Sequence, residues 1–278
     1  MMKTLTSYET IFNGEQIPKL GFGTWKIGGG SYADPKLDSA SLTALRTALE
    51  IGYTHFDTAE IYANGHAEEL LGQAIRETGV KRDSLFITTK VDPGHLRYEQ
   101  VLGACRGSLQ RLGMEYVDLY LIHWPRSVMH LNETFRALNK LVHDGQVRYL
   151  GVSNFSVNLL KQSQEHSETL IITDQVPYSL FDRSYAKNGV LEYCQQNDIL
   201  LTAYSPVEKG RLKPDWTLRS IAEGHRATSY QIALAWLIAQ PRVITIPMSY
   251  DPQHIKENFE SVNIVLTEKE IKSLNTIL

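Results

Sequence analysis

The sequence has few cysteines, no long run of like charge and no long apolar stretch. Only Cys105 and Cys194 occur among its 278 residues, which excludes a disulfide framework and a four-cysteine zinc site. A net charge of −3 argues against binding nucleic acid or anionic membranes through bulk charge. The longest apolar stretches, such as residues 232–239, are too short to span a bilayer, and the N-terminus lacks a signal-peptide core. We therefore expect a cytoplasmic protein of the size of an enzyme.

Eight apolar, β-branched segments alternate with segments of helical period. The expected strands are residues 20–24, 53–58, 85–90, 117–123, 147–152, 171–176, 200–204 and 243–247. Continuously apolar strands fit a parallel sheet that is buried on both faces. Eight strand–helix units in a chain of this length are typical of a (β/α)8 barrel. The pair Asn13-Gly14 between apolar residues predicts a β-hairpin ahead of the first strand.

The main alternative is an open, doubly wound α/β sheet. Such a sheet normally carries G-x-G-x-x-G after its first strand. Here the candidate is residues 21–26, which lack the third glycine, and no helix is expected to begin there. The barrel is therefore favoured. No linker or change of composition divides the chain, so we expect a single domain over residues 1–278.

Polar side chains stand at the expected carboxyl ends of six strands, where the active site of a barrel lies. Tyr62 lies five residues past Asp57, in the loop after the second strand. The strand-end residues are Asp57, Lys90, His123 with Trp124, Ser153 with Asn154, Gln175, and Tyr204 with Ser205. Unpaired buried polar groups are costly, so polar residues that converge on one mouth indicate a site.

Taken singly, several of these residues have ordinary structural interpretations. Asp57 could cap a helix or pair with a cation, and His123 could be a hydrogen-bonded core histidine. Lys90 is more informative, because an ammonium buried without a partner costs several kcal/mol. His55 and Asp57 could also be metal ligands of a hydrolase. A metal site needs at least three ligands, so we expect no metal.

Together the residues suggest the reduction of a carbonyl group. A lysine beside Tyr62 favours the phenolate and lowers the pKa of the phenol, and a carboxylate keeps the ammonium charged and in place. A phenol tuned in this way can give a proton to an oxygen that gains negative charge. A histidine at the same mouth can orient that oxygen. No side chain supplies a hydride, so a cofactor is implied.

The sequence resembles the aldo-keto reductases over essentially its whole length. The resemblance rests on five motifs that occur in the family's order, at residues 20–25, 52–62, 88–90, 118–125 and 145–155. It implies that Tyr62 is the general acid in reduction, that Lys90 and Asp57 tune it, and that His123 orients the substrate carbonyl. It further implies that Trp25 and Trp124 join Tyr62 and His123 as walls of the substrate pocket.

The resemblance also implies a binding site for a nicotinamide dinucleotide, a hairpin that closes the barrel floor, and two extra helices at residues 217–223 and at the C-terminus. The implied cofactor-binding residues are Gly23, Thr24, Ser153, Asn154, Gln175, Tyr204, Ser205, Pro206, Val207, Met248, Ser249, Tyr250, His254, Glu257 and Asn258. Lys209, Arg211 and Lys213 are cations available near the pyrophosphate.

The adenosine end departs from the family pattern. Met248 and His254 stand where a lysine and an arginine normally meet the 2′-phosphate of NADPH. Two lost charge-assisted contacts remove roughly 3 to 6 kcal/mol from phosphate recognition. The family favours NADP(H), so NADP(H) is the first expectation. Because of the two replacements, NAD(H) is a second expected cofactor.

The chain shows no long C-terminal tail to cover the mouth of the barrel, so we expect an open pocket and broad reduction of small aldehydes and ketones. A second interpretation is a non-catalytic NADP-binding subunit of a membrane channel, although no N-terminal extension for partner binding is evident. A structural role, as in lens, would not need the four catalytic residues. We expect a monomer or weak homo-oligomer, with Trp216 and Trp236 in the core.

Overall fold

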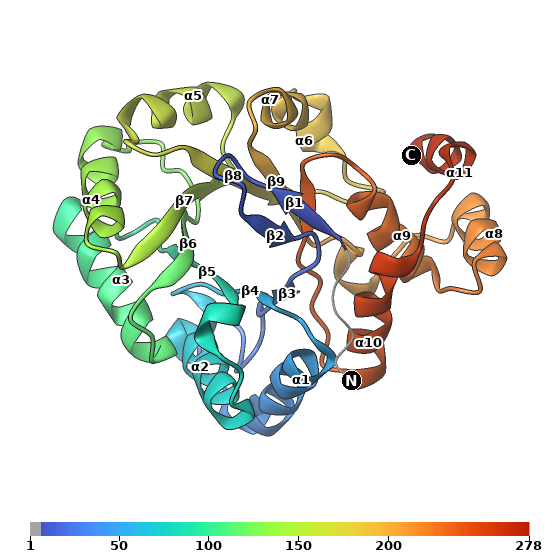
Figure 1. Ribbon diagram of the computed structural model, residues 1–278, viewed down its shortest axis with the longest axis horizontal. Helices are drawn as coiled ribbons and strands as arrows, with labels where there is room; N and C mark the ends of the chain where they lie inside the picture. The colour runs from blue at the N-terminus through green and yellow to red at the C-terminus, as the bar shows by residue number, and fades with distance from the viewer. Residues whose placement is uncertain (1–6, 278) are drawn as a thin grey trace.

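The computed structural model describes residues 7–277 (Figure 1). The strands are β1 (Tyr8–Thr10), β2 (Gln16–Pro18), β3 (Phe22–Gly23), β4 (His55–Asp57), β5 (Phe86–Val91), β6 (Val117–Ile122), β7 (Val147–Ser153), β8 (Ile171–Pro177), β9 (Leu200–Tyr204) and β10 (Val243–Thr245). The α-helices are α1 (Asp38–Ile51), α2 (His66–Thr78), α3 (Tyr98–Leu112), α4 (Leu131–His143), α5 (Val157–His166), α6 (Ser184–Lys187), α7 (Val190–Gln196), α8 (Trp216–Gly224), α9 (Ser229–Ile238), α10 (Pro252–Glu260) and α11 (Glu268–Asn275).

Strands β3 to β10 form one parallel sheet in sequence order. The sheet closes on itself because the segment before β3 pairs with β10. Leu20 lies opposite Thr245 in parallel register, and the Gly21 N–H donates to the Thr245 carbonyl at 2.8 Å. The helices lie around the outside of this ring (Figure 1). The predicted (β/α)8 barrel is confirmed, with its first, second and last strands shorter than the apolar segments suggested.

The N-terminal hairpin of β1 and β2 lies across one end of the barrel (Figure 1). Its turn contains Gly14 with φ of 85°, a left-handed conformation that glycine adopts at little cost. Ile11 and Ile17 pack with inward-facing strand residues such as Leu119 and Leu200. The hairpin therefore closes the barrel at the end opposite the carboxyl ends of the strands, as expected.

The helices pack on the sheet through apolar faces that the sequence predicts. In α1 the residues Leu42, Leu45 and Leu49 are buried, and the helix is followed by Gly52 with φ of 115°. Such a left-handed glycine is a common helix terminator, and it turns the chain toward β4. Among residues 7–277, no helix is long and apolar enough to cross a bilayer.

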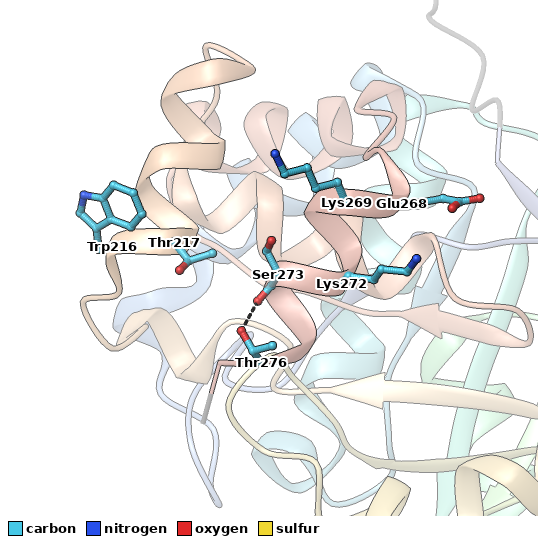
Figure 2. A pocket seen from close by; sticks show the side chains of 7 residues that line it. All are labelled: Trp216, Thr217, Glu268, Lys269, Lys272, Ser273 and Thr276. Carbon is cyan, nitrogen blue, oxygen red and sulfur yellow. Dashed lines mark hydrogen bonds between the residues drawn. The ribbon is translucent and has the colours of Figure 1, made fainter.

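The two extra helices, α8 and α11, lie beside one another outside the barrel (Figure 1). Trp236 in α9 is buried as expected, but the expectation for Trp216 is wrong, since its side chain is 81% exposed. Trp216 begins α8 and stands about 200° around the helix from the buried Leu218, so it faces solvent. It lies at the rim of a groove between α8 and α11 (Figure 2).

Candidate active site

A cavity of about 520 Å³ lies at the carboxyl ends of the barrel strands. It brings together residues from seven of the strand ends and the loops that follow them. Its lining comprises Gly23, Trp25, Lys26, Asp57, Ile61, Tyr62, His123, Trp124, Ser153, Asn154, Gln175, Tyr204, Ser205, Pro206, Val207, Lys209, Gly210, Ile246, Pro247 and Met248. Most of the residues singled out in the sequence therefore face one space.

Lys90 lies behind the cavity wall with no exposed surface. Its ammonium group donates to Asp57 Oδ1 at 2.5 Å, to the Thr58 carbonyl at 2.6 Å and to the Tyr62 hydroxyl at 3.4 Å. These three bonds use all three of its N–H groups. Since the Tyr62 oxygen accepts from Lys90, its own proton is free to point toward the cavity.

Tyr62 is held at the wall by a short turn after β4. The backbone at Ala63 and Asn64 is left-handed, with φ of 50° and 56°, and the Ala63 N–H donates to the Gly30 carbonyl at 3.0 Å. The Tyr62 ring lies edge-on to the Trp25 ring, with centroids 5.1 Å apart. These contacts hold the Tyr62 side chain at the wall of the cavity.

The electrostatics of Tyr62 differ from the sequence prediction. Burial, and then the Asp57 charge, raise the pKa of the Tyr62 phenol well above its ordinary value. The expected lowering of this pKa by Lys90 is therefore wrong for this structure. Burial is the larger cause, and the bond from Lys90 to the phenol oxygen at 3.4 Å does not offset it, since the same ammonium lies 2.5 Å from Asp57. Tyr62 is consequently protonated at neutral pH.

His123 stands at the end of β6, where its backbone N–H donates to the Val91 carbonyl at 3.2 Å. Its ring lies 5.5 Å from the Tyr62 ring, centroid to centroid. Burial, and then the Lys90 charge, lower the pKa of His123 to about 3. The imidazole is therefore neutral at neutral pH and carries one N–H, and Nδ1 has no hydrogen-bond partner within residues 7–277.

A second polar group borders the cavity on β7, β8 and β9. Ser153 Oγ donates to the Gln175 carbonyl at 2.7 Å, and the Tyr204 hydroxyl donates to Asn154 Oδ1 at 2.9 Å. Gln175 Nε2 donates to Asp57 Oδ2 at 2.7 Å. The four residues thus form one hydrogen-bonded wall that reaches the Asp57–Lys90 ion pair.

Trp25 and Trp124 form the rim of the cavity. Their side chains are 42% and 45% exposed, whereas Tyr62 and His123 below them are buried. His55, which the sequence offered as a metal ligand with Asp57, instead bonds through Nε2 to Thr88 Oγ1 at 3.2 Å. Both Asp57 oxygens are already engaged by Lys90 and Gln175.

Some sequence-predicted residues lie outside this cavity. Thr24 is buried next to Gly23, and Arg211 and Lys213 lie beyond Gly210, the last lining residue of their loop. The others belong to the segment after β10 and to α10, namely Ser249, Tyr250, His254, Glu257 and Asn258. The Tyr250 hydroxyl donates to the Lys26 carbonyl at 2.5 Å. Asp251 caps α10 by accepting from the backbone N–H groups of Gln253 and His254.

Sequence reasoning missed five residues of the lining: Lys26, Ile61, Gly210, Ile246 and Pro247. Lys26 and Ile61 each adjoin a residue that was predicted, Trp25 and Tyr62. Their position close to strand ends could have indicated that they line the cavity. However, loop residues of these types do not form a pattern that indicates a chemical role.

The aldo/keto reductase family model matches residues 19–278. The chain belongs to the aldo/keto reductase family. Aldo-keto reductases are oxidoreductases that reduce aldehydes and ketones with NAD(P)H, and this chain is an enzyme of that class. The interpretation as a channel subunit receives no support from the relatives described below.

Two curated relatives of this aldo-keto reductase are similar over nearly the whole chain. The 9,11-endoperoxide prostaglandin H2 reductase of Trypanosoma cruzi is 37% identical, with 96% of this chain and 90% of the relative covered. The glyoxal reductase of Bacillus subtilis is 35% identical, with 100% of this chain and 95% of the relative covered.

Two solved structures show the same fold. A thermostable aldo-keto reductase in complex with the inhibitor epalrestat is 45% identical, with a TM-score of 0.93 and coverage of 97% of this chain and 98% of that one. An aldo-keto reductase from Klebsiella pneumoniae in complex with NADPH is 33% identical, with a TM-score of 0.86 and coverage of 97% and 94%.

Proposed function

We propose that residues 1–278 act as one catalytic domain that reduces small aldehydes and ketones, with Tyr62 as the proton donor. The observation that carries this assignment is the bond from Lys90 Nζ to the Tyr62 oxygen at 3.4 Å. It leaves the phenol proton directed at the cavity, where a carbonyl oxygen would receive it. As that proton leaves, the ammonium stabilises the phenolate that forms.

His123 is the group that orients the substrate. Its neutral ring, with a pKa of about 3, can donate one N–H to the carbonyl oxygen without competing with Tyr62 as an acid. The ring lies beside the Tyr62 ring, so both groups can reach one oxygen atom. Asp57 holds Lys90 in place, because its carboxylate accepts from the ammonium at 2.5 Å.

The residues of the β7–β9 wall fit a nicotinamide carboxamide. A primary amide needs both donors and acceptors, and the side chains of Ser153, Asn154 and Gln175 supply both at the edge of the cavity. The Tyr204 ring borders the same space and offers a flat face for a nicotinamide ring. When bound there, NAD(P)H supplies the hydride that the carbonyl carbon receives.

NADP(H) is the proposed cofactor, with weaker discrimination against NAD(H) than the family pattern provides. Met248 contributes a thioether where a cation would face the phosphate, and His254 is exposed in the first turn of α10. Asp251 adds a negative charge at the start of the same helix. The NADPH bound to the Klebsiella pneumoniae relative supports NADP(H) as the first choice.

Broad specificity for small carbonyl compounds follows from the exposed rim of Trp25 and Trp124. The glyoxal reductase of Bacillus subtilis, whose name gives a small dicarbonyl as substrate, supports this proposal. We place the enzyme in the cytoplasm as a monomer or weak homo-oligomer.

The test is the loss of absorbance at 340 nm with NADPH or NADH and an aromatic aldehyde. We expect turnover of that aldehyde and of small dicarbonyls. Absence of turnover with either dinucleotide would refute the proposed activity. A strong preference for one bulky ketone over small aldehydes would refute the broad specificity.

A further inference from the structure

Asp174 is a buried carboxyl group that the reaction itself does not use. Its side chain has no exposed surface. Thr173 and Gln175, its neighbours in β8, face the barrel interior and the cavity, so Asp174 points to the helix side of the sheet. Its Oδ1 accepts from the Phe155 backbone N–H at 3.3 Å, and its Oδ2 has no partner within the described residues.

The turn above Asp174 is the one that carries Asn154. Asn154 has φ of 65°, which costs a residue other than glycine some stability unless its surroundings hold it there. The register of β7 and β8 shifts just before this point, so that Val152 lies opposite Asp174. The Asn154 N–H then donates to the Gln175 carbonyl at 3.0 Å, and the next N–H, of Phe155, donates to Asp174.

Two acceptors from β8 therefore fix the two successive N–H groups of this turn. The conformation of this turn sets the direction of the Asn154 side chain. Its amide group donates to Ser153 Oγ at 2.8 Å and accepts from the Tyr204 hydroxyl at 2.9 Å. Removing one acceptor would leave a buried N–H unpaired and free the turn to relax.

Asp174 is suited to this role as a neutral acid. Burial raises the pKa of its carboxyl group well above the ordinary value, although the backbone N–H groups of Phe155 and Asn154 oppose that rise. A neutral carboxyl keeps an oxygen acceptor, and an asparagine side chain offers the same acceptor in nearly the same shape.

We propose that Asp174 is a positioning residue for nicotinamide binding, which acts through the Asn154 turn and never contacts the dinucleotide. The inference rests on the proposed function, in which Asn154 holds the carboxamide. It follows that loss of the Asp174 acceptor weakens binding of the nicotinamide end and leaves binding of the adenosine end unchanged.

The experiment measures dissociation constants by calorimetry for two ligands, NADPH and 2′-phospho-ADP-ribose, which lacks the nicotinamide. For Asp174→Leu we expect a Kd for NADPH raised roughly tenfold, as the loss of about one buried hydrogen bond predicts. The Kd for 2′-phospho-ADP-ribose should stay within about twofold, and Asp174→Asn should stay within about threefold for both ligands. Asp174→Ala serves in the same way if the leucine variant does not fold.

The matched control is Thr173→Val, which removes a buried hydroxyl from the same strand. Thr173 Oγ1 donates to the Leu200 carbonyl at 3.0 Å and does not touch the turn, so both constants should be unchanged. Equal weakening of both ligands by Asp174→Leu, or the same loss in Asp174→Asn, would overturn the inference.

Asn154→Ala separates the two proposals. If it leaves the Kd for NADPH unchanged, the assignment of Asn154 to the carboxamide fails. If it weakens NADPH binding while Asp174→Leu does not, the carboxamide assignment stands and the role of Asp174 fails.

Discussion

Gln175 donates a hydrogen bond of 2.7 Å from Nε2 to Asp57 Oδ2, on the carboxylate whose other oxygen meets Lys90 at 2.5 Å. One amide thus touches both the expected nicotinamide site and the ion pair beneath the proton donor. Its Oε1 and the second N–H of its Nε2 are left to meet a ligand in the cavity. In the proposed mechanism, cofactor binding and proton transfer consequently share this residue.

Replacing Gln175 by leucine should affect both steps. The Kd for NADPH rises because an amide is lost, and kcat at saturating NADPH falls roughly tenfold because a buried Asp57 oxygen loses its donor. Asn154→Ala is the control, since it should raise Kd with a much smaller change in kcat. Stopped-flow and steady-state assays measure both. An unchanged kcat in Gln175→Leu would show that the bond to Asp57 has no role in turnover.

Lys90→Met should destabilise the fold as well as slow the reaction. It leaves the Asp57 carboxylate buried without its cation, and breaking a buried pair in this way costs about 3 to 5 kcal/mol. The double variant Lys90→Met/Asp57→Asn should recover part of that loss, because the uncompensated charge is gone. Urea denaturation measures the free energies of unfolding. Equal stability of the single and double variants would contradict the prediction.

Two buried histidines should make the free energy of unfolding depend on pH. Burial lowers the pKa of His123 to about 3 and that of His55 to about 4, against about 6.5 in the unfolded chain. The unfolded state therefore binds more protons between these values, and stability is lost as the pH falls below 6.5. The loss from each histidine should reach about 1.8 kcal/mol between pH 7 and pH 5.

The check is urea denaturation of the wild type and His55→Asn at pH 7 and pH 5. The variant should lose less stability over this interval, by about the contribution of one histidine. Parallel losses in both proteins would mean that His55 is protonated in the folded state.

Restoring the two cations should sharpen cofactor choice. Met248→Lys with His254→Arg adds two charge-assisted contacts to a 2′-phosphate, and we expect the ratio of kcat/KM for NADPH over NADH to rise at least about 100-fold. Met248→Gln with His254→Gln is the matched control, which adds polarity without charge. A wild-type preference for NADPH above about a thousandfold would contradict the proposed weakening.

The barrel and its main site residues were predictable because their signals are local. Short apolar segments that alternate with segments of helical periodicity predicted the positions of all eight strands. Polar residues such as Asp57 and Gln175 stood at the ends of these strands. Other features depend on three-dimensional packing. The raised pKa of Tyr62 reflects burial and the nearby Asp57 charge, and the exposure of Trp216 reflects which side of α8 meets the protein. Asp174 escaped notice because nothing in the sequence shows which N–H a buried carboxyl will meet.

The most direct measurement concerns Tyr62→Phe, which removes the proposed proton donor and keeps the ring. The account predicts a Kd for NADPH within about twofold of the wild type. It predicts a kcat for aldehyde reduction lower by roughly 10² to 10⁴, the usual contribution of a general acid. A variant that binds NADPH normally and keeps a kcat near that of the wild type would contradict the central claim that Tyr62 gives its proton to the substrate.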